Sequence, residues 1–267
     1  MKKSPVIVIP VYKSQINHLE ELAIQQCFKM LGNHRIVVIK PNELSLDHYS
    51  MTFPEVISLD NEYFANITGY NRLMLHSSFY ELFLDHEYLL IYQPDAFVFK
   101  DELTHWCSQG YDYIGAPWLR YAGFPDFIKK YKNYILRHVH TKLNITQPGT
   151  YLPTDIQFEN RVGNGGFSLR KVSRFYAICK QEEKMIDLYN GREEYQFAED
   201  VFWSIEVNRH KNRLKIPNFK TAVYFAFENN PSDALGLTKG AMPFGCHAWD
   251  RHLNFWEPIF KELGVSL

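Results

Sequence analysis

The sequence predicts an α/β protein whose central sheet is mostly parallel and flanked by helices. Short continuous apolar runs, such as residues 89–92, are typical of strands that are covered on both faces. Segments with apolar residues at helical spacing separate these runs, and such alternation of strand and helix favours a parallel sheet. With 267 residues, 46% of them hydrophobic, the chain is suited to a single large domain.

The first half of the chain supplies most of the predicted sheet. Strands are expected at residues 6–11, 35–39 and 55–59, each interrupted or bounded by a proline. Between the first two, apolar residues at helical spacing predict a helix that begins at Ser14 and ends at Gly32. A second helix is expected over residues 71–86, directly before an apolar strand.

That next strand, residues 89–99, places an acid at its own end. Pro94 cannot donate to a strand ladder, so pairing should lapse there and leave Asp95 at the carboxyl edge of the sheet. In open α/β sheets, ligands bind at that edge. The alternative is that residues 93–95 form an ordinary turn.

The second half of the chain contains three further features. A strand at residues 111–114 precedes a cluster of three glycines within residues 163–166, which would let the backbone pass close to a ligand. A helix is expected over residues 171–180. Glu199 and Asp200 open another helix, where acids also complement the helix dipole. A late strand is expected at residues 221–228.

Residues 123–153 interrupt the α/β pattern as a basic amphipathic insertion in the single domain of residues 1–267. Within residues 124–141, apolar positions recur at helical spacing among Lys129, Lys130, Lys132 and Arg137. Such a cationic helix is typical of an element that binds an anionic membrane surface. The alternative is a surface helix that packs its apolar side on the domain and leaves its basic side in solvent.

Composition and missing motifs exclude several classes of function. The 29 basic and 30 acidic side chains give a net charge of −1, which does not favour nucleic acid as a partner. No glycine-rich dinucleotide or phosphate loop follows the first strand. The four cysteines have no paired spacing, and the first apolar run is too short for a signal peptide. We therefore expect a cytoplasmic protein, held peripherally at the inner face of the plasma membrane by residues 124–141.

Five motifs come in the order that functional-site motifs have in nucleotide-sugar glycosyltransferases of the GT-A fold. They are Tyr-Gln-Pro-Asp-Ala, Tyr-Ile-Gly-Ala-Pro-Trp, Gly-Asn-Gly-Gly-Phe-Ser-Leu-Arg, Glu-Asp-Val-Phe-Trp and Phe-Gly-Cys-His-Ala-Trp. Through them the chain resembles, almost end to end, a bacterial GT-A-like family catalogued as DUF5672. The resemblance implies the GT-A fold and a glycosyltransferase activity.

The resemblance also implies a binding site for the donor, a nucleotide sugar that is expected to be UDP-linked. The implied donor-binding residues are Pro10, Tyr12, Tyr70, Asn71, Arg72, Gln93, Asp95, Gly165 and Gly166. Arg72 has the alternative of being an exposed charge at a helix start.

A divalent metal, Mn²⁺ or Mg²⁺, is the implied cofactor. Asp95 occupies the last position of the Asp-x-Asp element that binds the metal in GT-A enzymes, and His247 resembles the histidine that supplies another ligand. Gln93 occupies the first position, where its amide is a weaker ligand for a hard cation than a carboxylate. The alternative for His247 is a structural histidine.

The same resemblance assigns the chemistry. Asp200 is implied as the base that deprotonates the incoming hydroxyl, with Glu199 positioning donor or acceptor. Trp118 and Trp203 are candidates for an apolar face under an acceptor sugar.

The leading prediction is therefore an inverting hexosyltransferase. It would act on a glycan or lipid-linked acceptor in surface polysaccharide synthesis. A sugar-nucleotide nucleotidyltransferase and a non-catalytic carbohydrate-binding protein are the alternatives.

Overall fold

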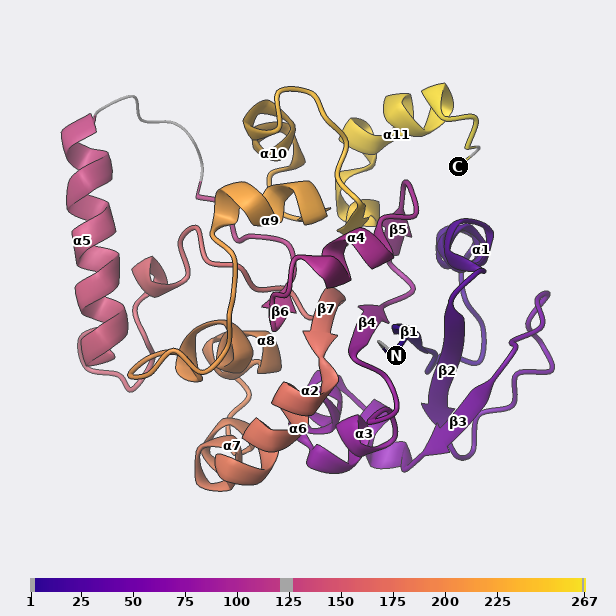
Figure 1. Cartoon of the computed structure of the whole chain (residues 1–267), viewed down its shortest axis with the longest axis horizontal. Coiled ribbons are helices and arrows are strands. Elements are labelled where there is room, and N and C mark those ends of the chain that lie inside the picture. The colour runs from indigo at the N-terminus through magenta and orange to yellow at the C-terminus, as the bar shows by residue number, and fades with distance from the viewer. Residues whose placement is uncertain (1–2, 121–126, 266) are drawn as a thin grey trace.

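A mixed six-stranded sheet with helices on both faces forms the centre of the molecule (Figure 1). The structure is a computed structural model that describes residues 3–120, 127–265 and 267, with the side chains of residues 127–131 outside the description. The strand order is β3-β2-β1-β4-β7-β6. The β1–β2, β2–β3 and β1–β4 pairs are parallel, whereas β7 runs antiparallel to both β4 and β6. The predicted α/β class with a mostly parallel sheet is confirmed.

The strands and helices follow one another along the whole chain. The strands are β1 (Val6–Pro10), β2 (Arg35–Pro41), β3 (Val56–Leu59), β4 (Tyr88–Tyr92), β5 (Ala96–Val98), β6 (Tyr113–Ile114), β7 (Phe167–Lys171), β8 (Ala226–Phe227) and β9 (Gly245–His247). The α-helices are α1 (His18–Leu31), α2 (Ile67–Leu75), α3 (Ser77–Glu81), α4 (Leu103–Ser108), α5 (Phe127–Leu143), α6 (Val172–Gln181), α7 (Glu183–Asn190), α8 (Glu199–Val201), α9 (Phe219–Phe225), α10 (Pro231–Leu237) and α11 (Leu253–Glu262). The short helical turns are η1 (Asn61–Phe64), η2 (Asp155–Gln157), η3 (Tyr195–Phe197), η4 (Phe202–Glu206) and η5 (Trp249–His252), of which η4 is a π-helical turn.

An apolar layer covers each face of the central sheet. Each strand contributes to both layers because its successive side chains point to opposite faces. From β1, Val6 and Val8 pack with α2, α3, α6 and α7 on one face. Ile7 and Ile9 pack with α1, α4 and α9 on the other. All four side chains have no exposed surface. The continuous apolar runs in the sequence therefore belong to strands that are covered on both faces.

Pro94 separates two strands that belong to different sheets. β4 ends at Tyr92, and β5 begins at Ala96 as the edge of a second, three-stranded sheet ordered β5-β9-β8. β5 and β9 are antiparallel, whereas β8 and β9 are parallel and end at the same edge. The short connection at residues 93–95 therefore lies where the two sheets meet, and the predicted break at Pro94 is confirmed.

Three local predictions need correction. Helix α1 is capped by Asn17, not Ser14, because Asn17 and Glu20 form a reciprocal capping box. The helix predicted over residues 71–86 is two short helices that meet at the extended residue His76. The strand predicted over residues 221–228 is mostly α9, and only Ala226 and Phe227 join a sheet.

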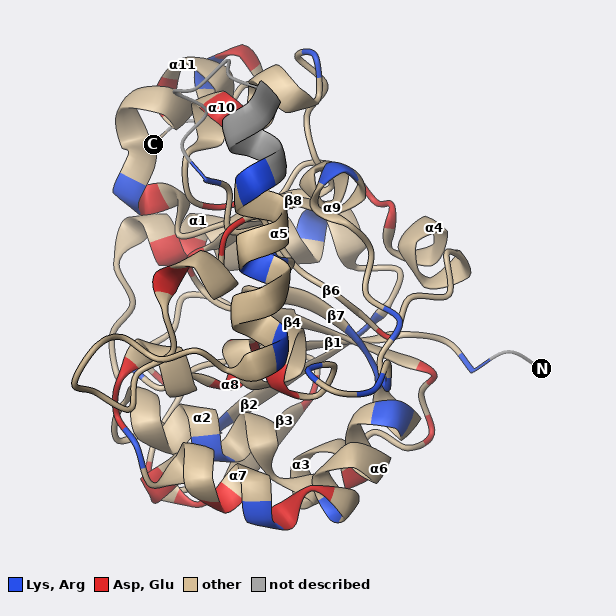
Figure 2. Cartoon of the chain, turned by 90° about the vertical axis from the view of Figure 1, so that its left-hand side faces the viewer, with Lys and Arg blue, Asp and Glu red and all other residues tan. Residues whose placement is uncertain are grey.

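Helix α5 stands apart at one edge of the molecule (Figure 1) and carries a run of basic residues (Figure 2). Its side chains differ from those of a helix that packs its apolar side on the domain. Ile135, Val139 and Leu143 are exposed, and they follow one another every fourth residue along one stripe of the helix. Arg137 instead donates to the backbone oxygen of Glu159 at 2.8 Å, and Lys142 donates to that of Arg209 at 2.7 Å.

The surface of α5 is therefore both apolar and basic. The alternative that packs the apolar side on the domain does not hold for Ile135, Val139 and Leu143, and Arg137 is bound to the Glu159 backbone instead of standing in solvent. Lys132 is exposed. The predicted contributions of residues 123–126 and of the Lys129 and Lys130 side chains lie outside the described residues. In the part of the chain that the structure describes, no helix is long and apolar enough to cross a membrane.

Candidate active site

The predicted site residues lie at strand ends where the two sheets meet. Gln93 and Asp95 follow β4, and His247 is the last residue of β9. Glu228 follows β8, the parallel neighbour of β9. Gly166 lies directly before β7, and its backbone oxygen accepts a hydrogen bond from the Gln93 N–H at 2.8 Å. Four separate chain segments therefore deliver polar groups to one place.

His247 is the centre of this cluster. Its Nε2 lies 3.0 Å from Gln93 Oε1 and 3.1 Å from Asp95 Oδ1. Its Nδ1 lies 3.2 Å from Glu228 Oε1 and 2.8 Å from Asn164 Nδ2. Glu228 can thus accept the Nδ1–H, the arrangement by which a carboxylate fixes the orientation and tautomer of a ligand histidine.

The two carboxylates keep this imidazole charged. Burial would lower the pKa of His247, but Asp95 and Glu228 outweigh it and raise that pKa to about 10. Burial would likewise raise the pKa of Asp95, but its attraction to His247 holds that pKa below the ordinary value. In the absence of another cation, His247 and Asp95 form a partly buried ion pair.

Glycine is required beside this cluster. A Cβ on Gly166 would lie 2.0 Å from His247 Nε2 and 2.5 Å from Gln93 Oε1, and one on Gly165 would lie 1.9 Å from Glu199 Oε1. No side chain fits at either distance. The glycine cluster that the sequence singled out therefore lets the backbone pass against the acids and the histidine of the site.

The carboxylate of Glu199 is bound by the buried guanidinium of Arg170. Arg170 Nη2 donates to Glu199 Oε1 at 2.9 Å, and Arg170 Nη1 donates to the Tyr80 hydroxyl at 2.9 Å. The Arg170 side chain has no exposed surface, and that of Glu199 is 4% exposed. Burial raises the pKa of Glu199, although Arg170 opposes the shift. The second oxygen, Glu199 Oε2, is buried without a hydrogen-bond partner among the described residues.

Asp200 has the electrostatic setting of a base that works near neutral pH. Burial, followed by repulsion from Glu199 and Glu228, raises the pKa of Asp200 from 3.8 to about 7. An effective general base has its pKa near the working pH. Asp200 also opens helix α8, which runs directly into the π-helical turn η4, a distortion that is frequent at functional sites.

The structure brings several of the predicted donor-binding residues to the same place. Pro10 ends β1 beside β4, and the charge of Asp95 contributes to raising the pKa of Tyr12, after burial. Burial raises the pKa of Tyr70, with Arg170 and Glu199 as neighbouring charges. Asn71 Oδ1 lies 3.3 Å from the Glu199 N–H.

Three other predicted residues lie differently. Arg72 is exposed in the last turn of α2. Trp118 packs edge-on against Phe158 and covers Gly163. The Trp203 side chain has no exposed surface and packs against Phe175 in the core. Trp203 therefore has no face to offer a sugar, and the acceptor role predicted for it is corrected to a structural one.

Three residues of the cluster were missed as site residues. Arg170 and Asn164 stand inside the glycine-rich motif, which was interpreted through its glycines alone. Glu228 was placed in a strand and given no role. An acid directly before Asn-Asn-Pro, at the end of an apolar segment, was the available signal for Glu228, because the same reasoning had identified Asp95.

Gln93, Asp95 and His247 carry the kinds of donor atom that bind a divalent cation. Oxygen and imidazole donors suit Mg²⁺ and Mn²⁺. The separations of 3.0 and 3.1 Å at His247 Nε2 are those of hydrogen bonds, so a bound cation would take the place of the Nε2 proton. Within the described ranges, no three His, Cys, Asp or Glu side chains form a metal-binding group. The set here has an amide as its third donor.

Comparisons with known proteins agree with this architecture. A family model described as "Protein of unknown function (DUF5672)" matches residues 54–247. Among solved structures, the chain is similar to the galactosyltransferase LgtC in complex with donor and acceptor sugar analogues. The TM-score is 0.52 at 16% sequence identity, with 91% of this chain and 86% of that chain covered. No curated protein matches the chain. The likeness to LgtC shows the fold, which is the GT-A fold.

Proposed function

Because the chain belongs to the DUF5672 family and has the GT-A fold, we propose that it is an inverting glycosyltransferase that uses a nucleotide-sugar donor. The observation that carries the proposal is a set of differently tuned acids around Glu228, which lies 3.2 Å from His247 Nδ1 and whose charge, after burial and Glu199, raises the pKa of Asp200. Asp95 is held ionised beside His247, whereas the pKa of Asp200 is raised to about 7. Asp95 is therefore suited to binding a cation that neutralises the diphosphate, and Asp200 is suited to accepting a proton.

Donor binding is assigned to the ends of β1 and β4 and to the glycine cluster. In this proposal, Pro10, Tyr12 and the segment Tyr70 to Arg72 contact the nucleotide, which we take to be UDP. The donor sugar would lie against the backbone of Gly165 and Gly166, which packs closely on Glu199 and His247.

Gln93, Asp95 and His247 would hold a divalent cation, Mn²⁺ or Mg²⁺. Glu228 would orient His247 through Nδ1 and leave Nε2 directed at Asp95 and Gln93. When bound, the cation supplies positive charge that stabilises the leaving diphosphate.

Asp200 acts as the general base. Its carboxylate accepts the proton of the acceptor hydroxyl as that oxygen attacks the anomeric carbon from the face opposite to the diphosphate, which inverts the configuration. Glu199, fixed on Arg170 and directed by Gly165, keeps a negative charge beside Asp200 and holds the pKa of Asp200 up.

The acceptor is proposed to be a glycan or a lipid-linked sugar of surface polysaccharide synthesis. The exposed stripe of Ile135, Val139 and Leu143, together with the exposed Lys132, supports peripheral binding to an anionic membrane that carries such acceptors.

The direct test is release of UDP from a panel of UDP-sugars, with and without Mn²⁺, in the presence of oligosaccharide acceptors. We expect one donor to be consumed by the wild type and not by Asp200→Asn. The product's anomeric configuration, read by NMR, should be opposite to that of the donor. Retention of configuration would contradict the base role of Asp200.

A sugar-nucleotide nucleotidyltransferase is the competing function. Such an enzyme needs a glycine-rich basic loop after its first strand, and Tyr12-Lys13-Ser14 contains no glycine. It would release pyrophosphate from a nucleoside triphosphate, so an assay for pyrophosphate with UTP and sugar phosphates separates the two functions.

A further inference from the structure

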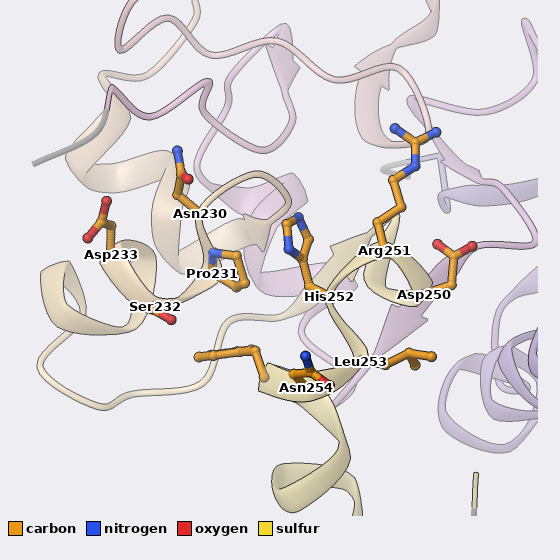
Figure 3. Close-up of a pocket in the computed structure, with 10 residues that line it drawn as sticks. Asn230, Pro231, Ser232, Asp233, Asp250, Arg251, His252, Leu253 and Asn254 are labelled. Atoms are coloured by element: carbon orange, nitrogen blue, oxygen red, sulfur yellow. The ribbon is translucent and has the colours of Figure 1, made fainter.

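A pocket of about 510 Å³ opens between the segments that follow β8 and β9 (Figure 3). It lies between the first turn of α10 and the segment formed by η5 and the start of α11. We call it the α10–η5 pocket, and its lining includes Asn230, Ser232, Arg251, His252, Asn254 and Phe255. Its volume lies in the range of about 300–1,000 Å³ that is typical of small-molecule sites.

The chain connects this pocket directly to the site. The parallel strands β8 and β9 end at the same edge and place Glu228 and His247 in the polar cluster. Each segment then continues into the pocket, with Asn230 two residues after Glu228 and Arg251 four residues after His247. The charge of Arg251 also acts on Asp95, where it is one of the causes that lower the pKa of that carboxyl.

Two strained residues shape these connections. Asn230 has φ 56° and Ala248 has φ 49°, so both lie in the left-handed region. A non-glycine residue stays in this region where its surroundings enforce it. Asn230 is further fixed by its side-chain N–H, which donates to the Leu119 backbone oxygen at 3.2 Å. Both chain turns therefore hold the pocket walls in a defined place beside the cluster.

The lining groups match a hydroxyl-rich ligand. Sugar hydroxyls both donate and accept, and the lining supplies amides, a hydroxyl, carboxylates, an imidazole and a guanidinium. Asp233 and Asp250 supply the carboxylates, whose oxygens accept hydrogen bonds from ligand hydroxyls. Figure 3 shows the side chains of Asn230, His252 and Arg251 directed to the same side.

We propose that the α10–η5 pocket is the subsite for the acceptor glycan and holds the sugar ring or rings next to the attacking hydroxyl. This inference rests on the proposed function and goes beyond it by placing the acceptor on α10 and η5.

The test uses saturation-transfer difference NMR of the full chain with lactose, maltose and cellobiose, with and without saturating UDP and Mn²⁺. At least one disaccharide should receive saturation, and UDP should not displace it. Ser232→Trp, which places a large ring in the pocket, should abolish the signal and leave UDP affinity unchanged. Asn212→Trp is the matched control, because Asn212 lines a different surface cavity.

The outcomes separate this inference from the proposed function. If UDP binds but no disaccharide does, or if UDP displaces the disaccharide, the pocket assignment is overturned while the enzyme proposal stands. Loss of UDP affinity in Ser232→Trp would assign the pocket to the donor instead. If neither UDP nor another nucleoside diphosphate binds, the proposed function fails, and the acceptor assignment fails with it.

Discussion

Asp200 is the residue whose environment differs most from that of an ordinary carboxylate. Its pKa is raised to about 7 by burial and by Glu199 and Glu228. As a base it must be ionised, so transfer should fall as the pH drops through about 7. Asp200→Asn should lower the rate by about 10²–10⁴ and leave donor binding intact. Initial rates between pH 5 and 9, together with UDP titrations of both proteins, check this. An equal loss of UDP affinity would contradict the role.

The same residue should make stability depend on pH. Because the pKa of Asp200 is higher in the folded state than its ordinary value of 3.8, the folded state binds the proton more tightly. Its ionisation therefore destabilises the fold as the pH rises from about 4 to about 7. We expect Asp200→Asn to raise the Tm relative to the wild type at pH 8 and to have a smaller effect at pH 4.5. An equal effect at both pH values would contradict the raised pKa.

Arg170 and Glu199 form the most deeply buried ion pair of the site. Arg170→Met leaves the Glu199 carboxylate buried and unpaired, which should cost about 3–5 kcal/mol of unfolding free energy. The double variant Arg170→Met with Glu199→Gln removes both charges, so it should cost less than the single variant. Urea denaturation of the three proteins gives these values. A double variant that is less stable than Arg170→Met would show that the pair is not the source of the cost.

Replacing Gly166 by alanine tests the geometry around His247. A Cβ at this position would lie 2.0 Å from His247 Nε2, so Gly166→Ala should displace the imidazole and weaken binding of UDP in the presence of Mn²⁺. Gly236→Ala is the control, because nothing lies within 4 Å of its Cβ position and its φ is not positive. Calorimetric titration with UDP should separate the two variants, and equal affinities would contradict the assigned site.

At the scale of elements, α5 combines exposed apolar side chains with basic ones. Ile135 is 45% exposed and Leu143 71% exposed, whereas Arg137 is bound to the domain. We expect the protein to co-sediment with vesicles that contain phosphatidylglycerol at low ionic strength. Ile135→Ser with Val139→Ser should reduce this binding through lost apolar insertion. Replacing Lys129, Lys130 and Lys132 by Gln should reduce it through lost attraction, about 1 kcal/mol per cation.

The matched control for α5 is Leu237→Ser, which removes an exposed apolar side chain from α10. Attraction to the anionic surface should weaken as salt is added, because ions screen exposed charges. If the wild type does not co-sediment, or if the α5 variants behave like Leu237→Ser, then α5 has no role at a membrane.

The element predictions that succeeded rest on local chemistry. The break at Pro94 follows from a missing N–H, and the buried strands follow from continuous apolar runs. The failures have long-range causes. Residues 221–228 are rich in β-branched and aromatic side chains, which favour a strand. Most of the segment is nevertheless helix α9, and only Ala226 and Phe227 pair with β9. The orientation of α5 depends on the Glu159 and Arg209 backbones, which are distant in sequence.

For the whole molecule, the sequence predicted the sheet class and much of the candidate site. Asp95 and His247 are 152 positions apart, yet both stand at strand ends, so motif order was sufficient to associate them. Arg170 and Glu228 were missed because their roles depend on neighbours that only folding provides. Trp203 was wrongly predicted as a site residue. The sequence motif does not show whether an aromatic side chain faces solvent or the core, and Trp203 lies in the core.

The central claim is that this fold binds a nucleoside diphosphate through Asp95. The most direct measurement is thermal shift of the wild type, Asp95→Ala and Asp200→Asn with nucleoside diphosphates, each with Mn²⁺ or with EDTA. A ligand at 100 times its Kd stabilises by about 2.7 kcal/mol, a shift of several degrees. We predict such a shift for at least one diphosphate, stronger with Mn²⁺, retained in Asp200→Asn and lost in Asp95→Ala. The absence of any shift in the wild type, or the same shift in Asp95→Ala, would contradict the account.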